Sequence, residues 1–129
     1  MNSDGSIYYA AFGRLIDRQI DSGIDALVVL GTTGEASTLS ESEKKQCIEF
    51  AINKINNRVP TIIGTGSNYT EQSVAISRFA ENAGADSLLV VTPYYNKTSQ
   101  MGLAKHFLKI ADSVSIPIIV YNVPQRTGM

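Results

Sequence analysis

Three features of the sequence predict an α/β fold, a partial (β/α)8 barrel with about four parallel strands and alternating helices. Short, continuously apolar runs alternate with segments of helical periodicity, which is typical of a parallel sheet covered by helices. Segments rich in Gly, Thr, Tyr and Asn follow all four apolar runs: Gly31–Glu35, Gly64–Asn68, Thr92–Asn96 and Tyr121–Gly128. A barrel builds its site from several strand ends, whereas a doubly wound sheet concentrates ligand contacts at one switch point, so the barrel is favoured.

The first half of the chain is expected to form two helices and two strands. Apolar residues at helical spacing between positions 11 and 22 predict one buried face: Phe12, Leu15, Ile16 and Ile20. Gly23 is expected to end that helix, and Ala26–Leu30 follows as a strand. Ser40 and Glu43 form a capping box for a helix with this buried stripe: Cys47, Ile48, Ala51, Ile52 and Ile55. The apolar run Val59–Ile63 predicts the second strand.

The second half repeats this order of elements. Thr70 is expected to cap a helix that ends at Gly84 and faces inward with Ala75, Ile76, Phe79, Ala80 and Ala83. Leu88–Val91 predicts a strand, and residues 100–113 predict a helix that buries Leu103, Phe107 and Ile110. Ile116–Val120 predicts the last strand. The pattern Gly-x-Asp-x-Leu-x-Val of residues 23–29 recurs at residues 84–90, so helix and strand come in paired units.

The composition indicates one globular domain, residues 1–129. Apolar residues make up 43% of the chain and charged residues 18%, which argues against disorder. The net charge of -1, with scattered Lys and Arg, gives no indication of a nucleic-acid surface. The start of the chain does not resemble a signal peptide, and no apolar run has the length of a membrane span. A single cysteine fits a reducing compartment, so a cytoplasmic location is expected.

Several possible motifs do not indicate nucleotide or metal chemistry. Gly64-Thr-Gly66 lacks the third glycine and the later acidic residue of a dinucleotide fingerprint. Gly31–Gly34 is not followed by the Lys-Ser/Thr pair of a phosphate-binding loop, and no residues have metal-ligand spacing. Cys47 is expected in the core and His106 on the solvent side of its helix. Glu35 is expected to orient the glycine turn rather than to react.

Three tyrosines at predicted strand ends are candidates for proton transfer. Tyr94 and Tyr95 follow Thr92-Pro93, and Tyr121 ends the last strand. A phenol with a pKa near 10 stays neutral while it passes protons on. Aromatic packing at the barrel mouth explains the same residues, and their pattern alone leaves both interpretations open.

The sequence resembles the dihydrodipicolinate synthase family of pyruvate-dependent class I aldolases. The resemblance rests on Gly31-Thr-Thr-Gly-Glu35, Thr92-Pro-Tyr-Tyr-Asn96 and Tyr121-Asn-Val-Pro-Gln-Arg-Thr-Gly128, which occur in the family's order along the whole chain. It implies that a lysine forms a Schiff base with pyruvate and that the enamine adds to aspartate semialdehyde, in lysine and diaminopimelate biosynthesis. The Thr32-Thr33 pair and Arg126 favour this family over the related N-acetylneuraminate lyases.

The resemblance also implies roles for individual residues. Thr33 and the backbone of Gly31 and Gly34 would hold the pyruvate carboxylate. Thr32 and Tyr121 would relay protons together with Tyr95, which reaches in from a neighbouring subunit of a homodimer or homotetramer. Arg126 would bind the carboxylate of the semialdehyde. Asn68 and Tyr94 correspond to positions that line a lysine-binding site in inhibited members, but Ser40–Lys45 has no histidine and Gln72 replaces an acidic residue.

The family's Schiff-base lysine would follow Met129, and the first strand of a complete barrel has no counterpart, because Gly5-Ser-Ile7 leads straight toward the first helix. The covered residues therefore correspond to the N-terminal half of the barrel without its first strand, and Ala26–Leu30 and Ile118–Tyr121 are expected to have unpaired edges. No cofactor is expected, and these residues alone are expected to be inactive. The remaining alternatives are a pyruvate aldolase of the N-acetylneuraminate lyase type and a non-catalytic half-barrel remnant or assembly module.

Overall fold

A single parallel sheet of four strands organises the chain. The computed structural model describes all residues, 1–129. The strands run in the order β1-β2-β3-β4, with these bounds: β1 Leu27–Val29, β2 Thr61–Gly64, β3 Ser87–Val91 and β4 Ile118–Tyr121. All three neighbouring pairs are parallel. The strand order and the alternation with helices confirm the predicted partial barrel.

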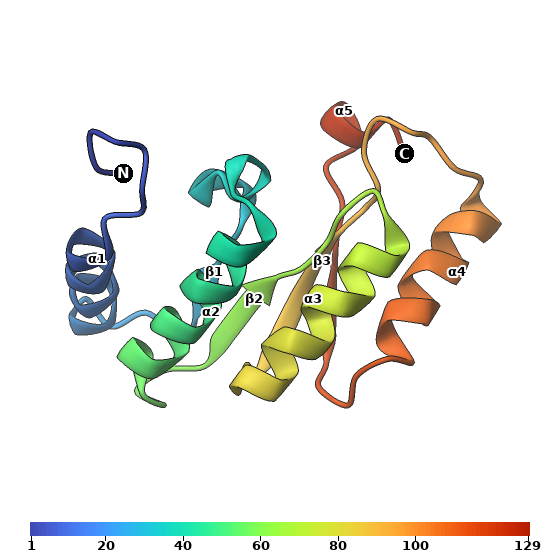
Figure 1. Ribbon diagram of the computed structural model, residues 1–129. Helices are drawn as coiled ribbons and strands as arrows, with labels where there is room; N and C mark the ends of the chain where they lie inside the picture. The colour runs from blue at the N-terminus through green and yellow to red at the C-terminus, as the bar shows by residue number, and fades with distance from the viewer.

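Four long helices lie side by side in one row, with the first of them beyond the outer edge of β1 (Figure 1). Their bounds are α1 Tyr9–Asp21, α2 Glu41–Ile55, α3 Thr70–Ala83 and α4 Gln100–Ala111. Two 3-10 turns, η1 Thr32–Gly34 and η2 Ala36–Thr38, follow β1, and the short helix α5 Pro124–Thr127 follows β4. The capping box is confirmed, because the Ser40 hydroxyl accepts from the Glu43 N–H while the Glu43 carboxylate accepts from the Ser40 N–H. None of the helices has the length and apolar content that a membrane crossing requires.

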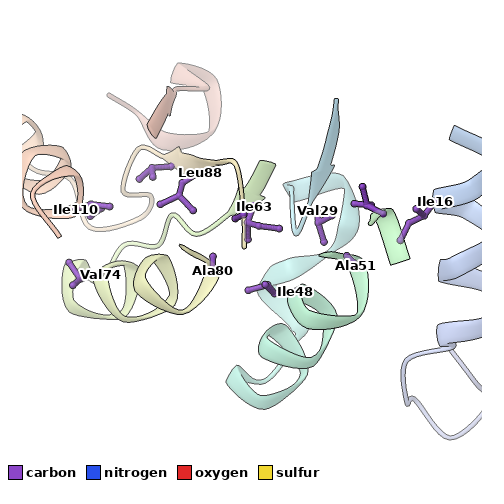
Figure 2. Packing of buried hydrophobic residues seen from close by; sticks show 12 residues of the cluster. Ile16, Val29, Ile48, Ala51, Ile63, Val74, Ala80, Leu88 and Ile110 are labelled. Carbon is purple, nitrogen blue, oxygen red and sulfur yellow. The ribbon is translucent and has the colours of Figure 1, made fainter. Parts of the chain in front are cut away.

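The helix-facing side of the sheet forms the hydrophobic core. Val29, Ile63 and Leu88 occupy the same level of neighbouring strands and are at most 4% exposed. They pack against buried residues of the helices, as Figure 2 shows: Ile16, Ile48, Ala51, Val74, Ala80 and Ile110. The opposite, concave side carries the alternate residues of each strand, among them Val28, Gly64 and Leu89.

The buried face of α3 differs from the predicted face. Ala75 is exposed, and the fully buried positions include Ser73 and Ser77, which a search for an apolar stripe does not select. The Ser77 hydroxyl donates to the Thr65 hydroxyl at 2.9 Å, which satisfies one of these buried groups. Thr70 is the first helical residue and not the cap, since Tyr69 occupies the N-cap position without a side-chain bond.

Both outer strands have a free edge, as predicted, because β1 and β4 end the strand order. Beside β1, α1 packs on α2, and a groove of about 800 Å³ separates its apolar face from the strand. Phe12 and Leu15 of α1 line one wall of this groove and Leu27 and Val29 the other. Leu15 is therefore 55% exposed, although its spacing predicts burial.

Candidate active site

The predicted site residues gather at one end of the sheet, where the strands terminate. The segments after β1, β2, β3 and β4 all lie at this end, which is the upper end of Figure 1. Parallel strands place their carboxyl ends at a common edge, so residues from distant parts of the sequence meet there. The loops that carry Thr32, Asn68, Tyr95 and Arg126 therefore surround one mouth of the half barrel.

Thr32, Thr33 and Tyr121 line one groove. The groove runs from the gap between α1 and β1 to the concave side of the sheet, and Gly31 and Gly34 also contribute to its lining. Both threonines are exposed, and Tyr121 is 37% exposed. Two hydroxyl-bearing threonines and a phenol thus face the same space, beside the apolar side chains of Val28 and Leu89. This space offers hydrogen-bond donors to a small anion at one end of an apolar channel.

The backbone of Tyr121 is fixed by Thr92. The Tyr121 carbonyl accepts the Thr92 N–H at 2.8 Å and the Thr92 hydroxyl at 3.2 Å. Thr92 is 1% exposed and directly precedes the segment with Tyr94 and Tyr95. It therefore joins the ends of β3 and β4. The sequence signal for Thr92 is its place just after an apolar run and before Pro93, which indicates a strand end.

Tyr95 lies apart from that groove. Its side chain is 93% exposed and its φ of 70° is in the left-handed region, unusual for a residue with a Cβ. The structure does not bring it to Thr32 and Tyr121 within one chain. Tyr94 is 38% exposed and is also absent from the groove lining.

Arg126 is presented by a small, well-bonded turn. The Thr127 hydroxyl donates to the Asn122 side-chain oxygen at 2.9 Å and to the Val123 carbonyl at 3.2 Å, and Thr127 is 5% exposed. The Arg126 N–H donates to the Val123 carbonyl at 2.8 Å. The guanidinium itself is exposed at the barrel mouth and does not line the groove with Thr33.

Asn68 lies in the segment after β2 and contacts the loop that carries Tyr94. Its carbonyl accepts from the Asn96 side chain at 3.4 Å. Nearby, the Gln72 amide donates to Glu41 at 3.1 Å and accepts from the Ser67 hydroxyl at 3.0 Å. Gln72 is therefore engaged with α2 through the carboxylate of Glu41.

Other candidate groups have structural surroundings. Cys47 is 5% exposed, and burial raises the pKa of its thiol, which opposes a nucleophilic role. Glu35 is exposed with a φ of 54°, and its carbonyl accepts from the Thr38 hydroxyl at 2.8 Å. The lysines lie on helices or, for Lys97, in the loop before α4. No group of three or more His, Cys, Asp or Glu side chains is arranged to hold a metal ion.

The prediction for His106 was wrong, because this residue is 6% exposed and not on the solvent side. Its Nδ1 lies 2.9 Å from the hydroxyl of Thr70, at the start of α3, and its Nε2 is buried without a partner. The helical pattern predicts Thr70 as a cap and does not indicate this contact between α3 and α4. Burial lowers the pKa of His106 below its ordinary value.

Acidification is expected to destabilise the fold through His106. Its pKa is lower in the folded than in the unfolded protein, so its contribution is complete above about pH 6.5 and is lost as the pH falls. The melting temperature should decrease from pH 7.5 to 5.5 more in the wild type than in His106→Gln, which retains an amide for Thr70. Equal decreases in both proteins would contradict this prediction.

Comparisons with known proteins show the family and the fold of this chain. The family model described as the dihydrodipicolinate synthetase family matches residues 1–129. A Clostridium novyi 4-hydroxy-tetrahydrodipicolinate synthase is 49% identical over 126 residues, which cover 98% of this chain and 43% of the relative. The crystal structure of a Bacillus anthracis dihydrodipicolinate synthase has a TM-score of 0.97 at 41% identity and covers 100% of this chain.

A structure with bound ligand is also similar. YagE from Escherichia coli K12, a prophage protein of the same family solved in complex with pyruvate, has a TM-score of 0.97 and 40% identity. The match covers 99% of this chain and 43% of YagE. This chain thus spans less than half the length of the relatives that it matches.

Proposed function

This chain belongs to the dihydrodipicolinate synthetase family, and we propose that it supplies part of the active site of a 4-hydroxy-tetrahydrodipicolinate synthase. The reaction condenses pyruvate with aspartate semialdehyde through a Schiff base, in the cytoplasm, as a step of lysine and diaminopimelate biosynthesis. The observation that carries the proposal is the single groove that Thr32, Thr33 and Tyr121 line together. The relatives of this name, at about half identity over the chain, support it.

Pyruvate binds at the Thr33 end of the groove. The Thr33 hydroxyl and the N–H groups of the turn that contains Gly31 and Gly34 donate hydrogen bonds to the pyruvate carboxylate. The carbonyl carbon then points along the groove toward the concave side of the sheet. The pyruvate complex of YagE, whose backbone matches this chain at a TM-score of 0.97, supports pyruvate as the ligand.

Proton transfer uses Thr32, Tyr121 and Tyr95. The Tyr121 hydroxyl delivers protons to the carbinolamine that precedes the Schiff base, and Thr32 connects it to Tyr95. Tyr95 acts in a neighbouring subunit of a homodimer or homotetramer. Its 93% exposure and its absence from the groove lining of its own chain support an action in trans.

Arg126 selects the second substrate. Its planar guanidinium forms two parallel hydrogen bonds with the carboxylate of aspartate semialdehyde. The bonds of Thr127 with Asn122 and Val123 hold the turn in which Arg126 is presented at the mouth.

The Schiff-base lysine is supplied by residues outside positions 1–129. A nucleophilic lysine needs surroundings that lower its pKa, such as a desolvated pocket. Five of the lysines lie on α2 and α4, and none of these lines the groove: Lys44, Lys45, Lys54, Lys105 and Lys109. Lys97 is exposed in the loop after Tyr95.

Assays of a full-length family protein that carries residues 1–129 test this function. The protein is expected to consume pyruvate with aspartate semialdehyde and to leave N-acetylneuraminate intact. Cleavage of N-acetylneuraminate without condensation would show that the chain belongs to an aldolase of the lyase type.

Lysine is expected to inhibit this protein weakly or not at all. A cationic amino acid needs carboxylates for its ammonium groups, and an unpaired buried charge costs several kcal/mol. Beside Asn68, Gln72 stands at the acidic position of inhibited members and uses its amide to bond Glu41. Inhibition by sub-millimolar lysine that disappears in Asn68→Ala or Tyr94→Ala would contradict this expectation.

A further inference from the structure

Gly64, the last residue of β2, has no room for a side chain. A Cβ at this position would lie 2.2 Å from the Leu30 carbonyl oxygen and 2.8 Å from the Leu30 carbonyl carbon. It would also lie 3.3 Å from the Gly31 nitrogen. The φ of Gly64 is outside the left-handed region, so glycine is required here by space and not by backbone conformation. The atoms that approach Gly64 this closely belong to the Leu30–Gly31 peptide, which directly precedes the Thr32-Thr33 turn.

The neighbours of Gly64 in the strand show which side of the sheet Gly64 faces. Ile63 is fully buried in the core, and Thr65 is 3% exposed. The Thr65 N–H donates to the Leu89 carbonyl at 3.0 Å, and its hydroxyl accepts from Ser77 at 2.9 Å. Since side chains alternate along a strand, Gly64 must face the concave side. The strand beside Gly64 is therefore held by a backbone bond to β3 and by a hydroxyl bond to α3.

The chain bends over Gly64 at Leu30. Leu30 has a φ of 59°, a left-handed conformation that a leucine rarely adopts. The bend lays the Leu30–Gly31 peptide over the end of β2 and leads directly into η1. Gly31, Thr32 and Thr33 then face the groove that Tyr121 also lines. A strained backbone conformation of this kind persists only where the surrounding contacts hold it in place.

We propose that Gly64 is a positioning residue for the pyruvate site. The Leu30–Gly31 peptide packs directly against Gly64. This contact sets the distance of the Thr33 hydroxyl and of the turn N–H groups from the sheet. This inference rests on the proposed function, because it assigns the turn to the pyruvate carboxylate. It also gives a role to the Gly64-Thr-Gly66 pattern, which the sequence alone did not connect with any ligand.

The test measures pyruvate binding in a full-length family protein that carries residues 1–129. The amount of pyruvate trapped by borohydride is followed against pyruvate concentration, and kcat is measured at saturating pyruvate. Gly64→Ala is expected to raise the half-saturating pyruvate concentration at least tenfold, with a smaller fall in kcat. Gly13→Ala is the matched control, since a Cβ there meets Phe50 at an ordinary 3.4 Å, and it should leave both values unchanged.

A second variant, tested beside a control, disturbs the same peptide without adding an atom at Gly64. Leu30→Val should also raise the half-saturating concentration, because a β-branched residue opposes a φ of 59°. Leu108→Val, at an exposed position of α4, is the matched control and should leave the value unchanged. If Gly64→Ala does not fold, Leu30→Val and its control test the positioning role of Gly64. A purely structural effect would lower the active fraction, and hence kcat, at an unchanged half-saturating concentration.

The outcomes separate this inference from the proposed function. If the wild-type protein traps no pyruvate, the proposed function is wrong. If the wild type traps pyruvate and Gly64→Ala or Leu30→Val binds it with an unchanged half-saturating concentration, the positioning role of Gly64 is wrong.

Discussion

Tyr121→Phe, in a full-length family protein that carries these residues, is expected to lower kcat about 100- to 10,000-fold, the usual range for a lost general acid–base group. The substitution removes only the hydroxyl. The ring remains, and so do both hydrogen bonds from Thr92 to the Tyr121 carbonyl. The half-saturating concentration of pyruvate should change little, because the carboxylate is held by the turn that contains Thr33.

Steady-state kinetics with both substrates measures this effect. Tyr69→Phe is the control, since Tyr69 is 61% exposed and its side chain does not cap α3. If Tyr121→Phe retains kcat within about threefold, proton relay through Tyr121 is excluded, and the residue serves the packing of the barrel mouth.

Arg126→Ala is expected to weaken the use of aspartate semialdehyde by about 10- to 150-fold, which corresponds to the 1.5–3 kcal/mol of a charge-assisted hydrogen-bonded pair. Trapping of pyruvate by borohydride should be spared, because Arg126 does not line the groove with Thr33. Arg126→Lys retains the charge without the planar fork and should give an intermediate loss.

The comparison of kcat/KM for the semialdehyde with the amount of trapped pyruvate checks this prediction. Arg18→Ala, on the exposed side of α1, is the control. An equal loss of both activities in Arg126→Ala would indicate that the turn held by Thr127 has collapsed. This result would contradict the role of Arg126 in binding the semialdehyde carboxylate.

The sequence predicted the elements of this fold because most of its signals are local. The repeated Gly-x-Asp pattern places Gly23 and Gly84 in left-handed conformations just before β1 and β3, with φ values of 80° and 103°. The capping box of α2 and the apolar strands likewise depend on neighbours in the sequence. Strand bounds differ from the expected ones by only a few residues, as in β2, which begins at Thr61 and not at Val59.

The errors arose where polar side chains are buried by long-range contacts. Ser77 is paired with Thr65 and His106 with Thr70, across 12 and 36 positions of the chain. A search for apolar periodicity assigns such residues to the surface. The predicted buried face of α3 was therefore displaced around the helix, and His106 was predicted to face the solvent.

The candidate site was only partly predictable for a similar reason. The glycine, threonine and tyrosine segments identified the mouth of the barrel and the groove residues Thr32, Thr33 and Tyr121. They gave no role to Thr92 or Gly64, which contact the backbone of Tyr121 and of Leu30. Such contacts depend on strand register, which the sequence does not display.

Peptide mapping after pyruvate and borohydride treatment tests the central claim most directly, namely that residues 1–129 bind pyruvate while another part of the protein supplies the lysine. In a full-length family protein that carries these residues, the account predicts one reduced pyruvate adduct per subunit, at a lysine outside positions 1–129. The 129-residue chain treated alone should show none. An adduct at Lys44, Lys45, Lys54, Lys97, Lys105 or Lys109, or no adduct in the full-length protein, would contradict the account.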